Sequence, residues 1–426
     1  MSLSITVKNK QNKAIELTLV KHHLEIKDTT TKELVSFDHI YAIQSVSDTL
    51  LISIATPTEQ EEPQQQATIR PPPKRWIRRT LEYQGAAAHF VTQLQQQALP
   101  KQPTFQDTQI HVIVNPTAGQ RRAEQDYAEI VLPMLRTAGF QQIHKCSKAQ
   151  RTQLDADAIV IGMGGDGTLH DLIHQYQGPF RLGVIPAGSG NAFALGLGIE
   201  SIEHAVLKII HGKHTPCYNM RVQLGHATQD QDWEDHVVHD TDPIQLLVVM
   251  SWGFHAQVVS KARYLRYLMG NQRFSWVAMF LLKFLYQYEG ELVLNHVQQY
   301  CLGEWQPEQD KIKLTQEKKF TYFLVSKQHS LEKGFKITPF ASALTEDMDV
   351  LVLRDVDADT LTKASMDAFQ GGQHVNSLEV EYFKAKQVLL RVKEKAELCL
   401  DGEIHQLPAK GVVDLQVISS GFTVFN

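Results

Sequence analysis

The sequence predicts a chain in three parts, with an α/β domain between a small β module and a second, mainly β domain. The central prediction rests on three segments in which a short apolar strand runs into a Gly- or Asn-rich turn and then opens a helix. Those strands cover residues 110–114, 158–161 and 182–185. A repeated order of strand, turn and helix is typical of a parallel sheet covered by helices, so we expect a Rossmann-like domain over residues 106–215.

The N-terminal part, residues 1–100, has a different pattern. Short alternating apolar runs predict an antiparallel sheet in residues 1–55, and residues 56–74 collect Pro, Gln and Glu, which predicts a loop within the module. A strand over residues 76–82 and a helix over residues 86–97 complete it. A small β module closed by one helix resembles a pleckstrin-homology fold.

Four basic residues surround Trp76 in this module: Lys74, Arg75, Arg78 and Arg79. Such a group suits anionic lipid headgroups. An ordinary solvated strand explains it as well, because charge runs usually serve solvation.

Within the α/β domain, each predicted helix ends at an expected terminator. The helix over residues 121–137 stops at Gly139, and the helix over residues 169–175 stops before Gly178 and Pro179. The three turns should therefore lie along one edge of the sheet, where ligands of α/β proteins bind.

The pattern returns to short strands in residues 216–426, which predicts a mainly β domain. The expected strands are residues 243–251, 320–326, 348–353, 388–392, 396–400 and 411–418, with helices near 257–288 and 359–370.

Composition excludes several classes of protein. The 426 residues are 43% apolar, and a net charge of −5 with a pI near 6.4 gives no general attraction to nucleic acid.

The four cysteines are far apart in sequence, which fits a reducing compartment and argues against a disulfide framework: Cys146, Cys217, Cys301 and Cys399. The N-terminus lacks the apolar core of a secretory signal, and the most apolar run, residues 276–285, is far shorter than the ~20 residues of a membrane span. We expect a cytoplasmic protein.

The three turns have the composition of a phosphate site. Helix N-termini offer unpaired backbone N–H groups, and glycines let the backbone close around a polyanion. The residues are Asn115, Pro116, Thr117, Gly119 and the following Arg121 in the first turn, Gly164, Gly165, Gly167 and Thr168 in the second, and Gly188, Ser189, Gly190 and Asn191 in the third.

Two other nucleotide folds fit less well. Residues 162–167 satisfy GxGxxG, but a dinucleotide site needs an acidic residue about 20 positions later, where this chain has residues 185–188, Ile-Pro-Ala-Gly. The GxxxxGK[ST] of a P-loop is absent from the sequence.

The motifs resemble those of the diacylglycerol and sphingosine lipid kinases. The first turn matches as Asn-Pro-x-x-Gly, the second as Gly-Gly-Asp-Gly-Thr and the third as Pro-Ala-Gly-Ser-Gly-Asn. Supporting similarity continues through residues 251–254, 371–374 and 400–403, so it covers roughly residues 108–426. The resemblance implies a nucleotide held between an α/β domain and a β-sandwich domain, with a lipid hydroxyl taking the γ-phosphate of MgATP.

Two acidic residues are candidates for the proton acceptor. Asp166 matches the residue assigned to that role in sphingosine kinases, although a buried Asp capping its own helix near Thr168 is the plain alternative. Asp401 matches the proposed base of bacterial diacylglycerol kinases, with Glu403 as its partner, although Asp-Gly is also a common hairpin turn. We expect Asp166 and Asp401 to converge on one magnesium-triphosphate cluster, with Mg²⁺ held by Asp166 and Glu403, directly or through water.

Several positions depart from the family pattern. Asp171 stands where the family commonly has Glu, and Arg121 where many relatives have Lys. Asn219 occupies a place that is often Asp in diacylglycerol kinases, which leans toward the sphingosine branch. Arg273 resembles a family arginine that reaches the nucleotide.

The segment after Trp252 bears on the substrate. Trp252, Phe254, Gln257 and Asp171 are the expected lipid-binding residues, yet sphingosine kinases carry acids where this chain has Gln257 and Val259. Residues 243–288 contain no Asp or Glu and interleave bases with aromatics: Lys261, Arg263, Arg266, Arg273 and Lys283 with Tyr264, Tyr267, Phe274, Trp276, Phe280 and Phe284. Such a stretch suits an acyl chain and an anionic membrane surface. An amphipathic helical pair packed on the sheet is an equally good interpretation.

The expected function is an ATP-dependent lipid kinase, with a sphingoid long-chain base as the leading substrate and diacylglycerol or ceramide as alternatives. A nicotinamide dinucleotide kinase also uses Gly-Gly-Asp-Gly-Thr, and a non-catalytic lipid-binding protein on the same fold is a further alternative. Residues 229–242 hold six acids with two histidines, which an exposed hairpin explains better than a metal site.

Overall fold

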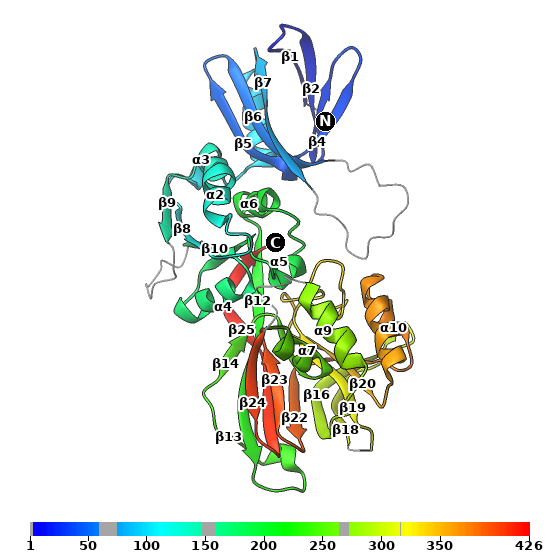
Figure 1. The fold of residues 1–426 in the computed structure, drawn as a ribbon. Coiled ribbons are helices and arrows are strands. Elements are labelled where there is room, and N and C mark those ends of the chain that lie inside the picture. The colour runs from blue at the N-terminus through cyan, green and yellow to red at the C-terminus, as the bar shows by residue number, and fades with distance from the viewer. Residues whose placement is uncertain (1–2, 59–74, 147–157, 177, 264–271, 316) are drawn as a thin grey trace.

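The computed structural model describes residues 3–58, 75–146, 158–176, 178–263, 272–315 and 317–426. Figure 1 shows the N-terminal sheet at one end, the α/β layer in the middle, and the second β domain at the other end with α7, α9 and α10 along one side. Residues 59–74 of the predicted loop, and with them Lys74, lie outside the described part, as do Tyr264, Arg266 and Tyr267.

The N-terminal module is the predicted antiparallel sheet. Its described strands follow the order β4-β3-β2-β1-β7-β6-β5, and a helix follows β7. The elements are β1 Leu3–Asn9, β2 Ala14–Val20, β3 His23–Lys27, β4 Lys32–Ser36, η1 Phe37–His39, β5 Ile40–Val46, β6 Thr49–Pro57, β7 Trp76–Gln84, α1 Ala88–Ala98 and η2 Gln102–Thr104. The pleckstrin-homology comparison stays a prediction.

The module packs against α6 (Ile202–His211) of the α/β domain. The ring of Trp76 stacks on that of His204, with centroids 5.0 Å apart. Lys101 Nζ donates a hydrogen bond of 2.7 Å to the carbonyl of Gly212, just after α6 ends. These contacts fix the module on the far side of α6 from the β domain (Figure 1).

The α/β domain contains the predicted parallel sheet. Strands β9, β8, β10 and β11 run parallel in that order, and β25 continues the sheet parallel to β11. The elements are β8 Gln109–Val114, α2 Ala123–Asp126, the π-helical η3 Tyr127–Val131, α3 Leu132–Ala138, β9 Gln142–Cys146, β10 Ile159–Gly164, α4 Asp166–Gln175, β11 Arg181–Pro186 and α5 Ala192–Gly196. The helix predicted over residues 121–137 is therefore interrupted by a π turn, next to Pro133, which has no N–H to donate.

The second β domain is a pair of packed sheets. Between them lies a core that includes Trp252, Phe320, Phe323 and Phe383. The elements are β12 His214–Ala227, η4 Trp233–Asp235, β13 Val237–His239, β14 Ile244–Leu246, β15 Val249–Gly253, α7 Phe254–Ala262, α9 Gln272–Leu282, β16 Gly290–Cys301, β17 Glu304–Trp305, β18 Gln309–Leu314, β19 Phe320–Ser326, β20 Met348–Arg354, α10 Ala358–Phe369, η6 Gln373–Asn376, β21 Glu381–Ala385, β22 Gln387–Val392, β23 Ala396–Leu400, β24 Glu403–Leu407 and β25 Gly411–Phe425.

Two sequence predictions about this domain are wrong in detail. The single strand expected over residues 243–251 is two strands, β14 and β15, separated by Leu247 and Val248. The boundary expected after residue 215 falls inside β12, which pairs with β25 along its length. β25 also pairs with β11, so this strand continues both the parallel sheet of the α/β domain and the sheet of the β domain that contains β12. The C-terminus therefore lies in the α/β layer (Figure 1).

In the described part of the chain, no helix is long and apolar enough to cross a membrane.

The shared strand gives a stability prediction. Phe425 is 2% exposed in the main core, whereas Leu378 is 78% exposed. Phe425→Ala should lower the free energy of unfolding by about 3–5 kcal/mol, because it removes a buried ring and leaves a cavity. Leu378→Ala should change it by less than about 0.5 kcal/mol. Urea denaturation of both variants checks this, and equal midpoints would contradict the shared core.

Candidate functional site

The three glycine-rich turns meet backbone to backbone. A Cβ built on Gly119 would lie 2.5 Å from the carbonyl oxygen of Ala187, so the first turn touches the third. A Cβ on Gly188 would lie 2.4 Å from Cα of Gly165, so the third touches the second. Only glycine permits these approaches, and Gly119 also has φ +52, a left-handed conformation. The turns thus form one rim at the ends of β8, β10 and β11.

Asparagine side chains hold the rim together. Asn115 Nδ2 donates to the hydroxyl of Thr168 over 2.9 Å, which ties the first turn to α4. Asn115 Oδ1 accepts from the N–H and the hydroxyl of Thr117. Asn191 closes the third turn, since its amide both accepts from the N–H and donates to the carbonyl of Gly188. Three residues predicted to contact ATP therefore have side chains that hydrogen-bond within the rim itself: Asn115, Thr168 and Asn191.

Asp166 caps a helix, but not its own. Its two carboxylate oxygens accept from the N–H groups of Ala192 and Phe193, at 2.9 and 3.0 Å, at the start of α5. The third turn's helix N-terminus is thus closed by Asp166 instead of open to an anion. Burial raises the pKa of Asp166, and the two backbone hydrogen bonds oppose that rise.

Asp401 has the same arrangement in the β domain. It sits in the hairpin between β23 and β24, where Asp401 and Gly402 both have positive φ, so the predicted hairpin is confirmed. Its carboxylate accepts from the N–H groups of Leu247, Val248 and Val249 at 2.7, 3.0 and 2.8 Å. These bonds explain the break between β14 and β15.

The two carboxylates influence each other. The pKa of Asp401 is raised to about 6, chiefly by burial and also by the charge of Asp166, while its backbone hydrogen bonds oppose the rise. A carboxylate offers about four lone-pair positions. Asp166 uses two of these positions for hydrogen bonds to backbone N–H groups and Asp401 uses three, so both retain capacity to accept a proton or face a cation.

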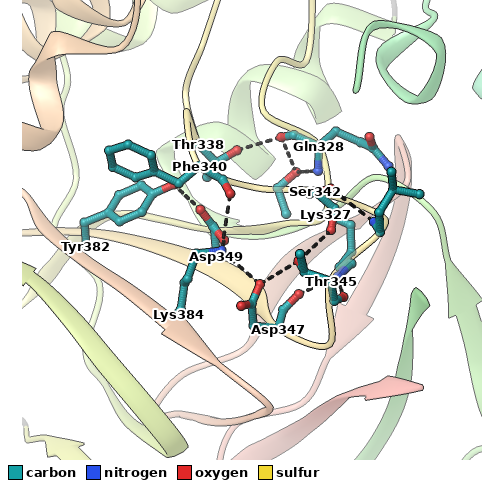
Figure 2. A network of polar contacts seen from close by, with 12 residues as sticks. Lys327, Gln328, Thr338, Phe340, Ser342, Thr345, Asp347, Asp349, Tyr382 and Lys384 are labelled. Atoms are coloured by element: carbon teal, nitrogen blue, oxygen red, sulfur yellow. Dashed lines mark hydrogen bonds and ion pairs between the residues drawn. The ribbon is translucent and has the colours of Figure 1, made fainter. Parts of the chain in front are cut away.

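A buried polar network supports residues 247 and 248, whose N–H groups bind the carboxylate of Asp401. Gln328 Nε2 donates to the carbonyl of Leu247 at 2.8 Å, and the Ser326 hydroxyl donates to that of Val248 at 2.8 Å. Figure 2 shows Gln328 joined to Thr338, and nearby Lys327 directed at the carbonyl of Thr345. Burial lowers the pKa of Lys327 to about 8.

The same network contains a buried ion cluster. Lys384 Nζ lies 2.9 Å from Asp347 and 2.8 Å from Asp349, and Tyr382 donates to Asp349 (Figure 2). Sequence reasoning missed this support, because the prediction ended with the strand at residue 326 and the charged residues of the cluster lie far apart in the sequence.

The open side of the rim fits a polyphosphate. Among the described residues, the backbone N–H groups of Gly119 and Gly167 meet no acceptor, and a Cβ on Gly167 would meet open space. Arg121 is exposed directly after the first turn, in a left-handed conformation, while Arg122 pairs with Asp126. Pro116, Ser189 and Gly190 are exposed or half-buried nearby.

Within the described residues, no group of three or more His, Cys, Asp or Glu side chains could hold a metal. Glu403 is exposed, and its charge acts on His170 of α4. Mg²⁺ usually takes one or two carboxylates together with substrate phosphates. The predicted pair of Mg²⁺ ligands, Asp166 and Glu403, therefore stays a prediction.

Three of the predicted lipid-binding residues line one cavity of about 370 Å³. Its walls are Trp252, Phe254, Gln257, Leu281, Phe284, Tyr286, Tyr288, Glu289, Glu394, Lys395 and Ala396. Asp171, predicted to join them, is exposed on α4 and lines no part of this cavity. The side chain of Arg273 lies outside the described ones, so its expected contact with nucleotide stays a prediction.

Polar residues near the cavity were not predicted. Glu397 accepts from Gln257 Nε2 at 3.4 Å and from Gln406 at 3.2 Å, and its charge helps to raise the pKa of Tyr288, which burial raises first. Ser251 and His255 are joined by a hydrogen bond of 2.7 Å. Burial lowers the pKa of His255 to about 4, so this imidazole is neutral at physiological pH.

A second cavity, of about 480 Å³, lies at the far end of α4 between Tyr176, Phe180 and Phe422. The three turns line neither of these two cavities.

Two parts of the chain match known sequence families. Residues 109–222 match the sequence family described as the diacylglycerol kinase catalytic domain, and residues 248–419 match the YegS C-terminal NAD kinase beta sandwich-like domain. A diacylglycerol kinase of Bacillus subtilis is 24% identical over 319 residues, 68% of this chain and 88% of that protein. An uncharacterized protein of Synechocystis is 28% identical over 173 residues, 36% of this chain and 35% of that protein. A crystal structure of a diacylglycerol kinase from Bacillus anthracis superimposes with a TM-score of 0.44 at 15% identity, covering 74% of this chain and 96% of the other.

The glycine contacts predict a difference between two like substitutions. Gly188→Ala forces a methyl group against the backbone of Gly165 and should destabilise the protein by about 1–3 kcal/mol. Gly167→Ala, in the first turn of α4 with open space around it, should leave stability unchanged or raise it by up to about 1 kcal/mol. Thermal unfolding measures both, and a stable Gly188→Ala variant would show that the rim can separate.

Proposed function

Because the chain belongs to the diacylglycerol kinase catalytic domain family of lipid kinases, we propose that it transfers the γ-phosphate of MgATP to a lipid hydroxyl. The observation that supports this proposal most strongly is that the three turns form one rim beside Asp166. The charge of Asp166 also raises the pKa of Asp401, which belongs to the other domain.

The proposed chemistry needs little more than positioning. In the proposal, the N–H groups of Gly119 and Gly167 and the guanidinium of Arg121 bind phosphate oxygens. Bound Mg²⁺ would neutralise charge on the transferring phosphoryl group, whose transition state is loose. Asp166 or Asp401 accepts the hydroxyl proton, and their raised pKa values make either a better acceptor than an ordinary Asp.

The leading substrate is a sphingoid long-chain base. The aromatic walls of the 370 Å³ cavity suit an acyl or alkyl chain. Residues 243–288 lack an acid to bind the ammonium group, but Glu397 of β23 reaches Gln257 and supplies a carboxylate beside the cavity. Glu289 is a poorer candidate, because Lys319 and Lys393 hold its pKa at about 2.

Diacylglycerol is the second candidate. The relative from Bacillus subtilis carries that substrate in its name, and no ammonium group is then needed at Glu397. Ceramide remains a third option. A nicotinamide dinucleotide kinase and a non-catalytic lipid-binding protein are the alternatives of another class.

The two acids give a catalytic prediction. Asp166→Asn and Asp401→Asn should each slow single-turnover phosphoryl transfer by about 10²- to 10⁴-fold, because the amide cannot take the proton. The amide oxygen can replace only one of the two accepting oxygens, because the amide NH2 cannot accept from a backbone N–H, so circular dichroism and thermal unfolding must show that each variant is folded before its rate is compared. Asp359→Asn, an exposed acid at the start of α10, is the matched control and should retain full rate. If both site variants stay within a few-fold of wild type, neither acid has the proposed role.

Product identity decides the substrate. Purified protein with labelled ATP should phosphorylate sphingosine in a panel that also contains ceramide, diacylglycerol and NAD. Glu397→Gln should then lower kcat/KM for sphingosine by about tenfold, because a desolvated ammonium loses its charge partner. The same variant should leave diacylglycerol unaffected. Phosphorylation of diacylglycerol alone would transfer the proposal to the second candidate, and transfer to no lipid would reject it.

A further inference from the structure

The helix α9 is apolar on the face that points away from the protein. Its inner face packs on the core through Val277, which is buried, and through the half-buried Leu281 and Leu282. Its outer face and the residues just after it hold five large apolar side chains that are 51% to 70% exposed: Trp276, Met279, Phe280, Phe284 and Tyr286. We call these five residues the α9 patch.

Part of the patch follows the helix. Trp276 and Phe280 are four residues apart, which places them on one side of α9, and Phe284 lies in the turn that follows. The rings of Phe280 and Phe284 are 5.6 Å apart. A helix that is apolar all round does not suit water, and a large exposed apolar cluster marks an interaction surface.

The patch leads into the cavity of about 370 Å³. Phe284 and Tyr286 belong to both, and Leu281 of the same helix lines the cavity from inside. The patch and the cavity therefore share part of one wall, next to the polar residues Glu289, Glu394 and Lys395 of the cavity lining.

The charge around the patch is positive. Lys283 lies between Phe280 and Phe284 and is exposed, and Lys261 and Arg263 are exposed at the end of α7, which packs against α9. The acids nearby are at the mouth of the cavity, where Glu394 accepts from Tyr286 at 3.4 Å and Glu289 pairs with two lysines. Aromatic residues flanked by bases suit the boundary between anionic headgroups and acyl chains.

We propose that the α9 patch docks the protein on an anionic membrane surface, with the aromatic rings among the acyl chains and Lys261, Arg263 and Lys283 against the headgroups. The cavity then opens at the bilayer. This deepens the proposed function, on which it rests for the lipid that enters the cavity, but the docking is measured without catalysis.

The test is binding to vesicles. Wild-type protein should sediment with phosphatidylcholine–phosphatidylglycerol vesicles and bind phosphatidylcholine vesicles more weakly. The variant Trp276→Ser/Met279→Ser/Phe280→Ser, whose changed residues do not line the cavity, should lose about tenfold or more in vesicle affinity. Its activity on lipid presented in detergent micelles should match wild type. Lys261→Glu/Arg263→Glu should weaken binding to the anionic vesicles alone.

The matched control is Leu302→Ser, a 69% exposed leucine in the turn after β16. It should bind vesicles like wild type. Unchanged vesicle binding by the triple variant would overturn the proposal, and so would size-exclusion data in which wild type is a dimer that the triple variant dissociates, because the patch would then cover a second copy. If the wild-type protein binds vesicles but phosphorylates no lipid, and the triple variant does not bind vesicles, the docking surface is supported and the lipid kinase proposal fails.

Discussion

The site depends on the direct contact of three backbone segments. The turns after β8, β10 and β11 approach so closely that a single methyl group at Gly119, Gly165 or Gly188 would collide with main-chain atoms of a neighbouring turn. Parallel strands bring their carboxyl ends to one edge, but side chains would normally keep the following turns apart. The glycines remove that separation, and the amides of Asn115 and Asn191 then lock the segments at hydrogen-bonding distance.

Each domain contributes one half-buried carboxylate, and both are held by backbone N–H groups. Asp166 gathers the first N–H groups of α5, and Asp401 gathers those of residues 247–249. Backbone donors stabilise the charged form, while burial opposes it and dominates, so both acids have raised pKa values. Removing water from a carboxylate and holding it with fixed dipoles suits a group that exchanges a proton beside a polyanion.

The fold was largely predictable because its signals are local. Strand lengths, turn glycines and helix terminators lie within a few residues of one another, and β19 and β23 agree with the predicted ranges. The failures concern long-range contacts. Asp166 caps a helix 26 residues away, and Asp401 interrupts a strand more than 150 residues earlier, which no local pattern records. No local pattern records the contact of Glu397 on β23 with Gln257 either. Asp171 was predicted to bind lipid together with Trp252, Phe254 and Gln257, but it does not line their cavity.

The strand β25 has a consequence for how the protein is made. It lies between β11 and β12, with parallel pairing to one and antiparallel pairing to the other. While the chain is being synthesised, β11 emerges from the ribosome more than 200 residues before its neighbour β25. The α/β layer therefore has an open edge until residues 423 and 424, which pair with β11, have been made, and a fragment cut after residue 215 would keep that edge exposed. The α/β domain and the β domain of this chain are thus one folding unit, completed by the same strand.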